Sequence, residues 1–233
     1  MLNKFSPLLK KINIEFKNDK LLENVFVHRS YLNEHKKFYL PSNEKLEFLG
    51  DSVLSLITTI YLYKNYPNLD EGNYTDIKAA IVRTESLGEA AKKIKLGDYL
   101  YLSKGEHLQF GKDNINILAD SFEALVGAVF IDQGFDTAFS FVSHFLFEAK
   151  LHYIVENKLY LSPKSRFQEY IQAKYKILPI YRVIEESGPE HLKHFSVAVF
   201  IREDKIALGS GNSKKAAEEA AAKKALEKME NLL

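Results

Sequence analysis

The pattern of apolar and polar positions changes character near residue 157. Before this point apolar residues recur every three to four positions, and no segment alternates with a period of two. Four long stretches show the spacing: 44–63, 74–96, 115–131 and 136–155. Such periodicity predicts α-helices. We expect a turn at 70–72 and a polar loop at 104–114 between them. Residues 1–156 are therefore predicted to form an all-α domain.

The pattern after residue 157 predicts a small α+β domain. Ser162-Pro163 is typical of a helix start, with Ser as the N-cap and Pro at the first helical position. The period then switches to two at 195–201, which indicates a strand. Further strands are expected on both sides, and an alanine-rich helix follows: 180–186, 205–209 and 213–232. This order predicts an α-β-β-β-α domain over 162–233, joined through a linker at 157–161.

Three carboxylates share one face of the helix that begins at residue 44. Glu44, Glu47 and Asp51 are spaced i, i+3 and i+7. The rest of this helix is apolar nearly all round, so we expect it to be buried or to lie in an interface. Acids do not stay unpaired in such surroundings, because like charges in a low dielectric repel each other and are poorly solvated. A divalent cation is the simplest partner that keeps them ionised.

A second acid pair, Asp120 and Glu123, interrupts the apolar stretch 115–131 at i, i+3 spacing. Two buried helices that each carry such a stripe can face one another, and four or more carboxylate oxygens suit Mg²⁺ or Mn²⁺. Acids on helices are most often simply solvated, however. The residues alone leave the metal site and the solvated surface as open alternatives.

Composition narrows the class of protein. Hydrophobic residues make up 46% of the chain and charged residues 27%, which is typical of a globular protein. The chain has no cysteine, which excludes disulfides and thiolate zinc sites. The N-terminal residues carry charges every few positions, unlike a signal peptide. No apolar run approaches the ~18 residues of a membrane span. We therefore expect a cytoplasmic protein without a membrane partner.

The two predicted domains differ in charge. Residues 1–156 carry 18 Lys and Arg against 21 Asp and Glu, whereas residues 157–233 carry 14 against 10. The last helix begins Ser213-Lys214-Lys215, and lysines in a first turn oppose the helix dipole at a cost of ~0.3–1 kcal/mol each. Two cations beside free N–H groups at a helix start can bind phosphate. The alternative is an ordinary solvated pair of lysines.

These motifs together resemble the ribonuclease III family. Glu44-Lys-Leu-Glu-Phe-Leu-Gly-Asp-Ser-Val-Leu54 is similar to its signature motif, and Ala119-Asp-Ser-Phe-Glu-Ala-Leu125 is similar to its second acidic motif. Asp70-Glu71-Gly72 resembles a third, shorter motif, and the C-terminal domain resembles a double-stranded RNA-binding domain. The order is that of a bacterial member of the family. Lys45 is a departure, since the family usually has Arg there.

The resemblance implies an endoribonuclease that cuts double-stranded RNA to 5′-phosphate and 3′-hydroxyl ends, in processing of ribosomal and other RNA. It implies Mg²⁺ as the cofactor, with Mn²⁺ able to substitute, and a homodimer. The residues that it assigns to the metal are Glu47, Asp51, Asp120 and Glu123. Glu44 and Glu71 match auxiliary acids near the scissile phosphate, and Phe48 matches an aromatic at the dimer interface. Without the resemblance, Glu71 is a turn residue and Phe48 a core residue.

The resemblance also implies how RNA is gripped. The matching contacts lie on the first helix of the second domain, in the 188–193 loop and at the start of the last helix: Gln168, Glu169, His191, Lys193, Ser213, Lys214 and Lys215. Binding is then by duplex shape over ~16 base pairs. Three other functions stay open. They are a non-catalytic RNA-binding protein, a metal-dependent phosphohydrolase acting on a small molecule, and a helical interaction scaffold. The six acids disfavour the first and the basic domain disfavours the second.

Overall fold

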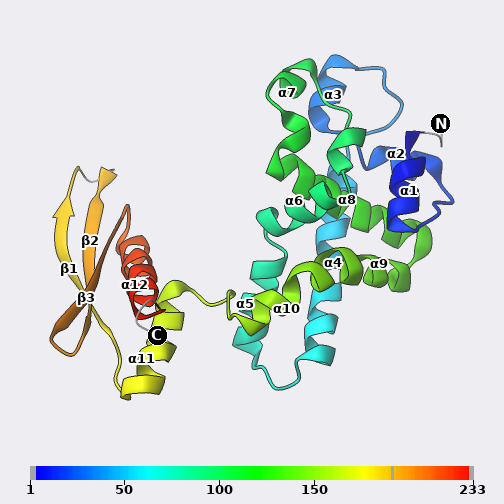
Figure 1. Cartoon of the computed structure of the whole chain (residues 1–233). Coiled ribbons are helices and arrows are strands. Elements are labelled where there is room, and N and C mark those ends of the chain that lie inside the picture. Colours follow the sequence, from blue (N-terminus) through cyan, green and yellow to red (C-terminus); the bar gives the residue numbers. More distant parts are fainter. Residues whose placement is uncertain (1–3, 190–191, 231–233) are drawn as a thin grey trace. The chain divides into compact units, whose positions relative to one another are not determined.

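The chain divides into two compact units, Met1–Asn157 and Lys158–Leu233. The computed structural model describes residues 4–189 and 192–230 (Figure 1). The division lies inside the predicted linker at 157–161. The first unit is helical, as expected, and its elements are α1 (Ser6–Ile12), α2 (Asp19–Asn24), α3 (Arg29–Glu34), α4 (Glu44–Asn65), α5 (Glu71–Ile81), α6 (Thr84–Lys93), η2 (Leu96–Tyr99), α7 (Lys104–Leu108), η3 (Gly111–Asp113), α8 (Ile115–Gln133), α9 (Phe135–Val142), η4 (Ser143–Leu151) and α10 (His152–Glu156).

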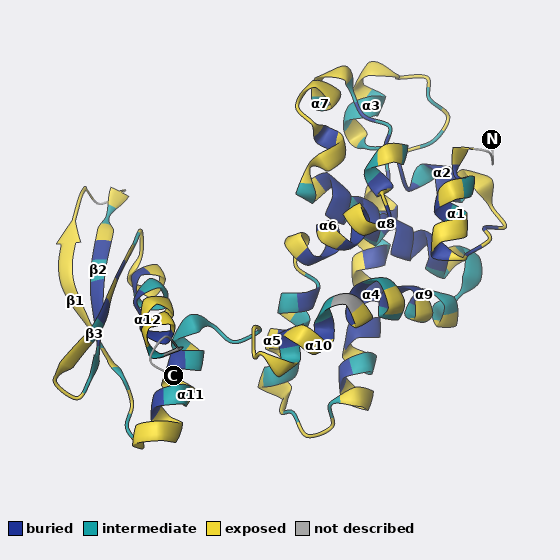
Figure 2. Ribbon diagram, in the orientation of Figure 1, coloured by how far each residue is buried: buried dark blue, intermediate teal, exposed yellow. Residues whose placement is uncertain are grey.

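Helix α8 forms the centre of the first unit and packs against both α4 and α6. Its apolar side chains are buried on most sides, as the dark segments of Figure 2 show. Two glycines set the spacing between α4 and α8. A Cβ on Gly50 would overlap the carbonyl oxygen of Glu123, and one on Gly127 would overlap the carbonyl oxygen of Leu46. The two backbones therefore approach more closely than any larger residue allows, at the level of the acids.

The start of α4 is tied to the segment that precedes α3. Asn43 is buried, and its backbone N–H donates to the Val27 carbonyl at 2.8 Å. Its side-chain amide donates to the Val25 carbonyl at 3.0 Å, so it anchors two chain segments rather than capping its own helix. Tyr101 pairs with Val27 in a single parallel bridge on the other side. The beginnings of α3 and α4 are thereby held side by side.

The stretch 74–96, predicted as one helical segment, is two helices. The break falls at Val82 and Arg83, where the backbone of Arg83 is extended (φ −68°, ψ 154°). Ser86 explains why the break is tolerated, because its hydroxyl donates to the Ala80 carbonyl that the end of α5 leaves without a helical partner. The apolar spacing runs through the break, so periodicity alone does not show it.

The predicted turn at 70–72 is wrong, because it is a helix start. The side chain of Asp70 accepts from the Asn73 N–H at 2.8 Å as an N-cap, and Glu71 is the first residue of α5. The predicted polar loop at 104–114 contains α7 and η3, and the Ser103 side chain caps α7. The predicted helix over 136–155 is interrupted by the π-helical segment η4.

The second unit has the predicted α-β-β-β-α order. Strands β1 (Ile180–Ser187), β2 (His194–Ile201) and β3 (Asp204–Gly211) form an antiparallel sheet in the order β1-β2-β3. Val197 in the central strand pairs with Val183 and Gly209. Helices α11 (Pro163–Tyr175) and α12 (Lys214–Glu230) pack over it, and the buried side chains between them are Phe167, Ile171, Val199, Ala207, Ala221, Ala222, Ala225 and Leu226. The expected helix end at 232 lies outside the described residues.

Among the helices in the described part of the chain, α4 is long and apolar enough to cross a membrane by length and composition alone. The expectation that no stretch approaches a membrane span is therefore too strict. A single helix of this kind is weak evidence for a membrane span, because the core helix of a soluble protein meets the same test.

Candidate functional site

Three of the predicted acids converge where α4 and α8 touch. Glu47 of α4 and Asp120 and Glu123 of α8 each offer a carboxylate oxygen, and these oxygens lie within 4.8 Å of one another. All three side chains are partly buried. We call these three residues the acid cluster. The close approach at Gly50 brings the two helices near enough for side chains of this length to meet.

Burial raises the pKa values of all three acids, and neighbouring carboxylates add to the effect at Glu123 and Glu47. Burial, followed by the charges of Asp51, Glu47 and Asp120, raises the pKa of Glu123 to about 8. Burial and the charge of Asp120 likewise raise the pKa of Glu47. Burial also raises the pKa of Asp120. Full ionisation of the cluster is therefore unfavourable unless a cation offsets the negative charge.

The donor set fits a hard divalent cation. Three converging carboxylates supply oxygen ligands, the type preferred by Mg²⁺, Mn²⁺ and Ca²⁺. Asp51 is exposed one turn after Glu47 and acts on Glu123, so it lies beside the cluster without belonging to the set of oxygens within 4.8 Å. A cation here would lower the pKa values that burial raises.

Glu44 lies at the rim of the acid cluster. One of its carboxylate oxygens accepts from the Ser42 hydroxyl at 2.7 Å, and the other is 3.8 Å from the Arg29 guanidinium. Its charge contributes to the raised pKa of Glu47, so the two carboxylates are electrostatically coupled. Glu44 is therefore near the acid cluster but more accessible than its three members.

The structure does not bring Glu71 to the acid cluster of its own chain. Two hydrogen bonds show that α4 and α5 run antiparallel. The Lys78 ammonium donates to the Ser55 hydroxyl, and the Tyr74 hydroxyl donates to the Tyr66 carbonyl, so residues later in α5 meet residues earlier in α4. Glu71 lies seven residues from Lys78 toward the far end of α4. Glu47 lies eight residues from Ser55 in the opposite direction. At 1.5 Å per residue, the two acids are separated by about 20 Å.

Phe48 is not a core residue of the single chain. It is 77% exposed, and Leu56 and Tyr63, which are also exposed, follow on the same side of α4. Spacings of eight and seven residues keep the three side chains in one stripe along the helix. We call Phe48, Leu56 and Tyr63 the apolar stripe. It lies next to the acidic side of the same helix, as the sequence of α4 requires.

The predicted RNA contacts of the second unit are mostly exposed. Gln168 and Glu169 lie on α11, and Glu169 forms an ion pair with Lys158 at 2.6 Å. Lys193 pairs with Glu186 at 2.6 Å, also on the surface. Both ion pairs are at least partly exposed, so each contributes little to stability. His191 lies outside the described residues.

The start of α12 presents the predicted lysine pair. The Ser213 hydroxyl accepts from the Ala216 N–H at 3.1 Å and so caps the helix. Lys214 and Lys215 follow on the surface, and the ammonium of Lys214 lies 5.7 Å from the centre of the Phe195 ring. The two lysines therefore project from a fixed helix start.

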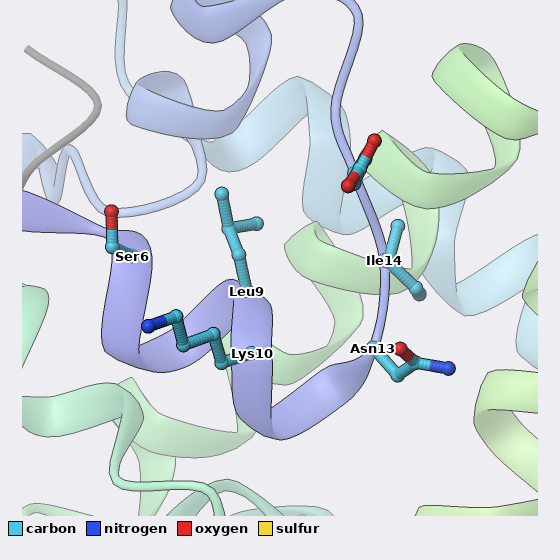
Figure 3. A pocket seen from close by; sticks show the side chains of 6 residues that line it. Ser6, Leu9, Lys10, Asn13 and Ile14 are labelled. Carbon is cyan, nitrogen blue, oxygen red and sulfur yellow. The ribbon is translucent and has the colours of Figure 1, made fainter.

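A hollow on the first unit is unrelated to the acid cluster. It has a volume of about 470 Å³ and is lined by α1 and the loop after it (Figure 3). The backbone carbonyl of Glu15, in this lining, accepts from the Gln133 side chain at the far end of α8. Gln133 is ten residues beyond Glu123, or about 15 Å along the helix.

Two residues of the site were missed by the sequence analysis. Gly50 had a usable signal, because a glycine inside a helix costs ~1 kcal/mol and needs a packing reason. Arg29 had none. It lies 15 residues before Glu44 in the chain, and only the fold brings it to the acids.

Comparisons with known proteins agree with these features. Residues 18–150 match the family model Ribonuclease-III-like, and residues 163–229 match the double-stranded RNA binding motif. The chain is 44% identical over 228 residues to Ribonuclease 3 of Chloroflexus aurantiacus, which covers 97% of this chain and 92% of that protein. It is 43% identical over 230 residues to Ribonuclease 3 of Borreliella burgdorferi, covering 99% and 93%.

A solved structure supports the same assignment for the first unit. The nuclease domain of ribonuclease III from Campylobacter jejuni superposes with a TM-score of 0.57 at 31% identity, covering 62% of this chain and 96% of that one. The resemblance seen in the motifs is thus confirmed over nearly the whole chain. The chain belongs to the ribonuclease III family of double-strand-specific endoribonucleases.

Proposed function

We propose that this protein hydrolyses phosphodiester bonds of double-stranded RNA at the acid cluster, with Mg²⁺ as the cofactor and Mn²⁺ able to substitute. The observation that carries the proposal is the convergence of the Glu47, Asp120 and Glu123 carboxylates in a chain that also matches a double-stranded RNA binding motif. When bound, a divalent cation supplies the Lewis acidity that makes water a competent nucleophile toward phosphorus. The expected products have 5′-phosphate and 3′-hydroxyl ends.

The side chains around the cation have separate tasks. Glu47, Asp120 and Glu123 would hold it, and their raised pKa values would make them strong ligands once deprotonated. Asp51 adds negative charge beside them and completes the set of four predicted ligands. Glu44, fixed by the Ser42 hydroxyl at the rim, is suited to orient water near the scissile phosphate.

The assay that tests this function uses a long, perfectly paired RNA. We expect cleavage in Mg²⁺, no cleavage with EDTA, and product ends that a 5′-phosphate-dependent exonuclease degrades. Duplex binding with no cleavage in Mg²⁺ would indicate a non-catalytic RNA-binding protein. Hydrolysis of small phosphodiesters at a comparable rate would instead favour a small-molecule phosphohydrolase. Ribosomal RNA precursors in the cytoplasm are the proposed physiological substrates.

We propose that the apolar stripe of α4 joins two copies of the chain. Phe48, Leu56 and Tyr63 form an exposed row that water solvates poorly. The C. jejuni nuclease domain is described as having a region involved in dimer formation. Because Glu71 lies about 20 Å from the acid cluster of its own chain, its predicted auxiliary role requires a dimer that brings it to the cluster of the other copy.

Replacing Phe48 is expected to weaken the dimer strongly. Each copy loses ~1.5–3 kcal/mol of apolar burial in Phe48→Ala, and two-fold symmetry doubles this, so Kd should rise on the order of 10²–10⁴-fold. Sedimentation equilibrium measures the change. Phe110→Ala is the matched control, since Phe110 is 74% exposed but lies outside α4. An unchanged Kd for Phe48→Ala would place the interface elsewhere.

The lysine pair of α12 is expected to act as a phosphate grip. Lys214→Gln/Lys215→Gln should weaken duplex binding and reduce the slope of log K against log[salt] by about 1 for each phosphate that the variant no longer binds. Lys223→Gln/Lys224→Gln removes two exposed lysines from the same helix, further from its start, and should leave the slope unchanged. Binding is measured by fluorescence anisotropy over a salt series. Equal slopes for the two double variants would contradict the grip.

A further inference from the structure

The guanidinium of Arg29 lies at the rim of the acid cluster. One of its terminal nitrogens is 3.8 Å from a carboxylate oxygen of Glu44. Glu44 and Glu47 both lie in the first turn of α4, so the ion pair places the guanidinium of Arg29 beside the acidic face of this helix.

The backbone of Arg29 is fixed by its neighbours. His28 caps α3, and its Nδ1 accepts from the Ser30 N–H at 3.3 Å and lies 2.7 Å from the Ser30 hydroxyl. The Ser30 hydroxyl in turn accepts from the Ser103 N–H at 3.1 Å. The segment before His28 is bonded to Asn43, directly before Glu44. Arg29 therefore starts from a rigid position beside the acids.

The side chain of Arg29, by contrast, is only loosely held. The ion pair with Glu44 is long, and the side chains are 73% and 54% exposed, so it contributes ~0–1 kcal/mol to stability. The Ser42 hydroxyl already holds the other oxygen of Glu44. As the first residue of α3, Arg29 also opposes the helix dipole. A positive charge that opposes the helix dipole and adds little stability indicates a functional role.

Charge balance indicates what the cation is for. Glu44, Glu47, Asp51, Asp120 and Glu123 bring five carboxylates to the site, and one divalent ion would offset only two of their charges once they are ionised. An RNA phosphate is also an anion and is repelled by the remainder. A guanidinium binds phosphate oxygens in a planar, two-pronged geometry that an ammonium does not reproduce.

We propose that Arg29 leaves Glu44 when RNA binds and contacts a non-bridging oxygen of the scissile phosphate, a role that rests on the proposed nuclease function. There the guanidinium stabilises the negative charge that builds up on the phosphoryl oxygens as water attacks. Glu44, released from the pair, is free to accept a hydrogen bond from water. In this role Arg29 touches the substrate directly.

The test compares Arg29→Gln and Arg29→Lys with wild type in single-turnover cleavage of an RNA duplex in Mg²⁺. We expect Arg29→Gln to lower the rate roughly 10²-fold, as loss of one oxyanion donor does, with less than a threefold change in duplex Kd. Arg29→Lys should recover part of the rate. Arg83→Gln is the matched control, because Arg83 forms a similar exposed ion pair with Glu85 at 3.7 Å. This variant should cleave RNA at the wild-type rate.

A double variant separates a substrate contact from a positioning role. If Arg29 acted solely through Glu44, adding Arg29→Gln to Glu44→Gln would change nothing further; we expect the same ~10²-fold loss in both backgrounds. Wild-type rates for Arg29→Gln, or a loss confined to the background with Glu44 intact, overturn the proposal while the nuclease function stands. Wild-type protein that does not cleave duplex in Mg²⁺ overturns both. Should Arg29→Gln fold poorly, Arg29→Lys alone carries the comparison: a rate equal to wild type with unchanged sensitivity to salt would contradict a two-pronged contact.

Discussion

Glu123→Gln is expected to abolish cleavage of an RNA duplex in Mg²⁺ while leaving duplex binding intact. Glu123 is the acid of the cluster whose pKa is raised furthest, because it is partly buried and lies near the charges of Asp51, Glu47 and Asp120. Glutamine preserves its shape but removes the charge that binds a cation. Losing one of three converging ligands costs several kcal/mol of transition-state stabilisation, so the rate should fall roughly 10³-fold or more. Single-turnover cleavage and fluorescence anisotropy measure the two quantities separately.

The raised pKa of Glu123 adds a pH dependence to the same experiment. Between about pH 4.5 and pH 8 the folded metal-free protein holds a proton at Glu123 that the unfolded chain has released. Its stability is therefore expected to fall as pH rises through this window. A cation binds the ionised form and displaces the proton, so metal affinity should increase with pH and level off above about 8. Calorimetry in buffers of different ionisation enthalpy measures the released proton.

Two results would contradict this account of Glu123. One is normal cleavage by Glu123→Gln in Mg²⁺, which would remove Glu123 from the site. The other is metal binding whose pH dependence is the same in Glu123→Gln and wild type, which would assign the proton elsewhere. Glu156→Gln is the control, because Glu156 is an exposed glutamate at the end of α10. It should match wild type in both measurements.

The convergence of the acids could be predicted because its information is local. Carboxylates inside apolar helices are an anomaly that a few residues reveal, and helical spacing alone places Asp120 and Glu123 on one side of α8. The packing of α8 against α4 follows less directly from the sequence. Both helices are too apolar to be surrounded by water, so each needs another element to cover it, and in the structure they cover each other.

The parts that could not be predicted depend on distance in the fold. The motif that contains Glu71 comes soon after the acids of α4 in the sequence, but within one folded chain Glu71 lies about 20 Å from Glu47. The reason is that α4 leads away from the acid cluster and Glu71 stands at the start of α5, near the far end of α4. Arg29 shows the opposite case, because hydrogen bonds through Asn43 bring it to Glu44. Neither outcome is encoded in a short motif. Both depend on how helices pack.

Gly50→Ala is expected to damage both stability and cleavage, without removing any group that touches metal or RNA. A methyl group on Gly50 would overlap the Glu123 carbonyl oxygen, and backbone cannot rotate away as a side chain does. Overpacking of this kind typically lowers the free energy of unfolding by about 1–3 kcal/mol. Relief requires α4 and α8 to separate, which moves Glu47 away from Glu123. A misplacement of ~1 Å can cost on the order of 10²-fold in rate.

Two further glycine variants test whether helix spacing is the cause. Gly127→Ala inserts a methyl group from the α8 side, against the Leu46 carbonyl oxygen, and should produce the same combined loss. Gly72→Ala is the control, because its Cβ would lie 3.5 Å from the Asp70 carboxylate, an ordinary contact, and alanine favours the helix by up to ~1 kcal/mol. Thermal unfolding and metal affinity are measured for all three. If Gly50→Ala kept wild-type metal affinity and cleavage, the spacing between α4 and α8 would not be what sets the acid cluster, and its geometry would have to come from the side chains themselves.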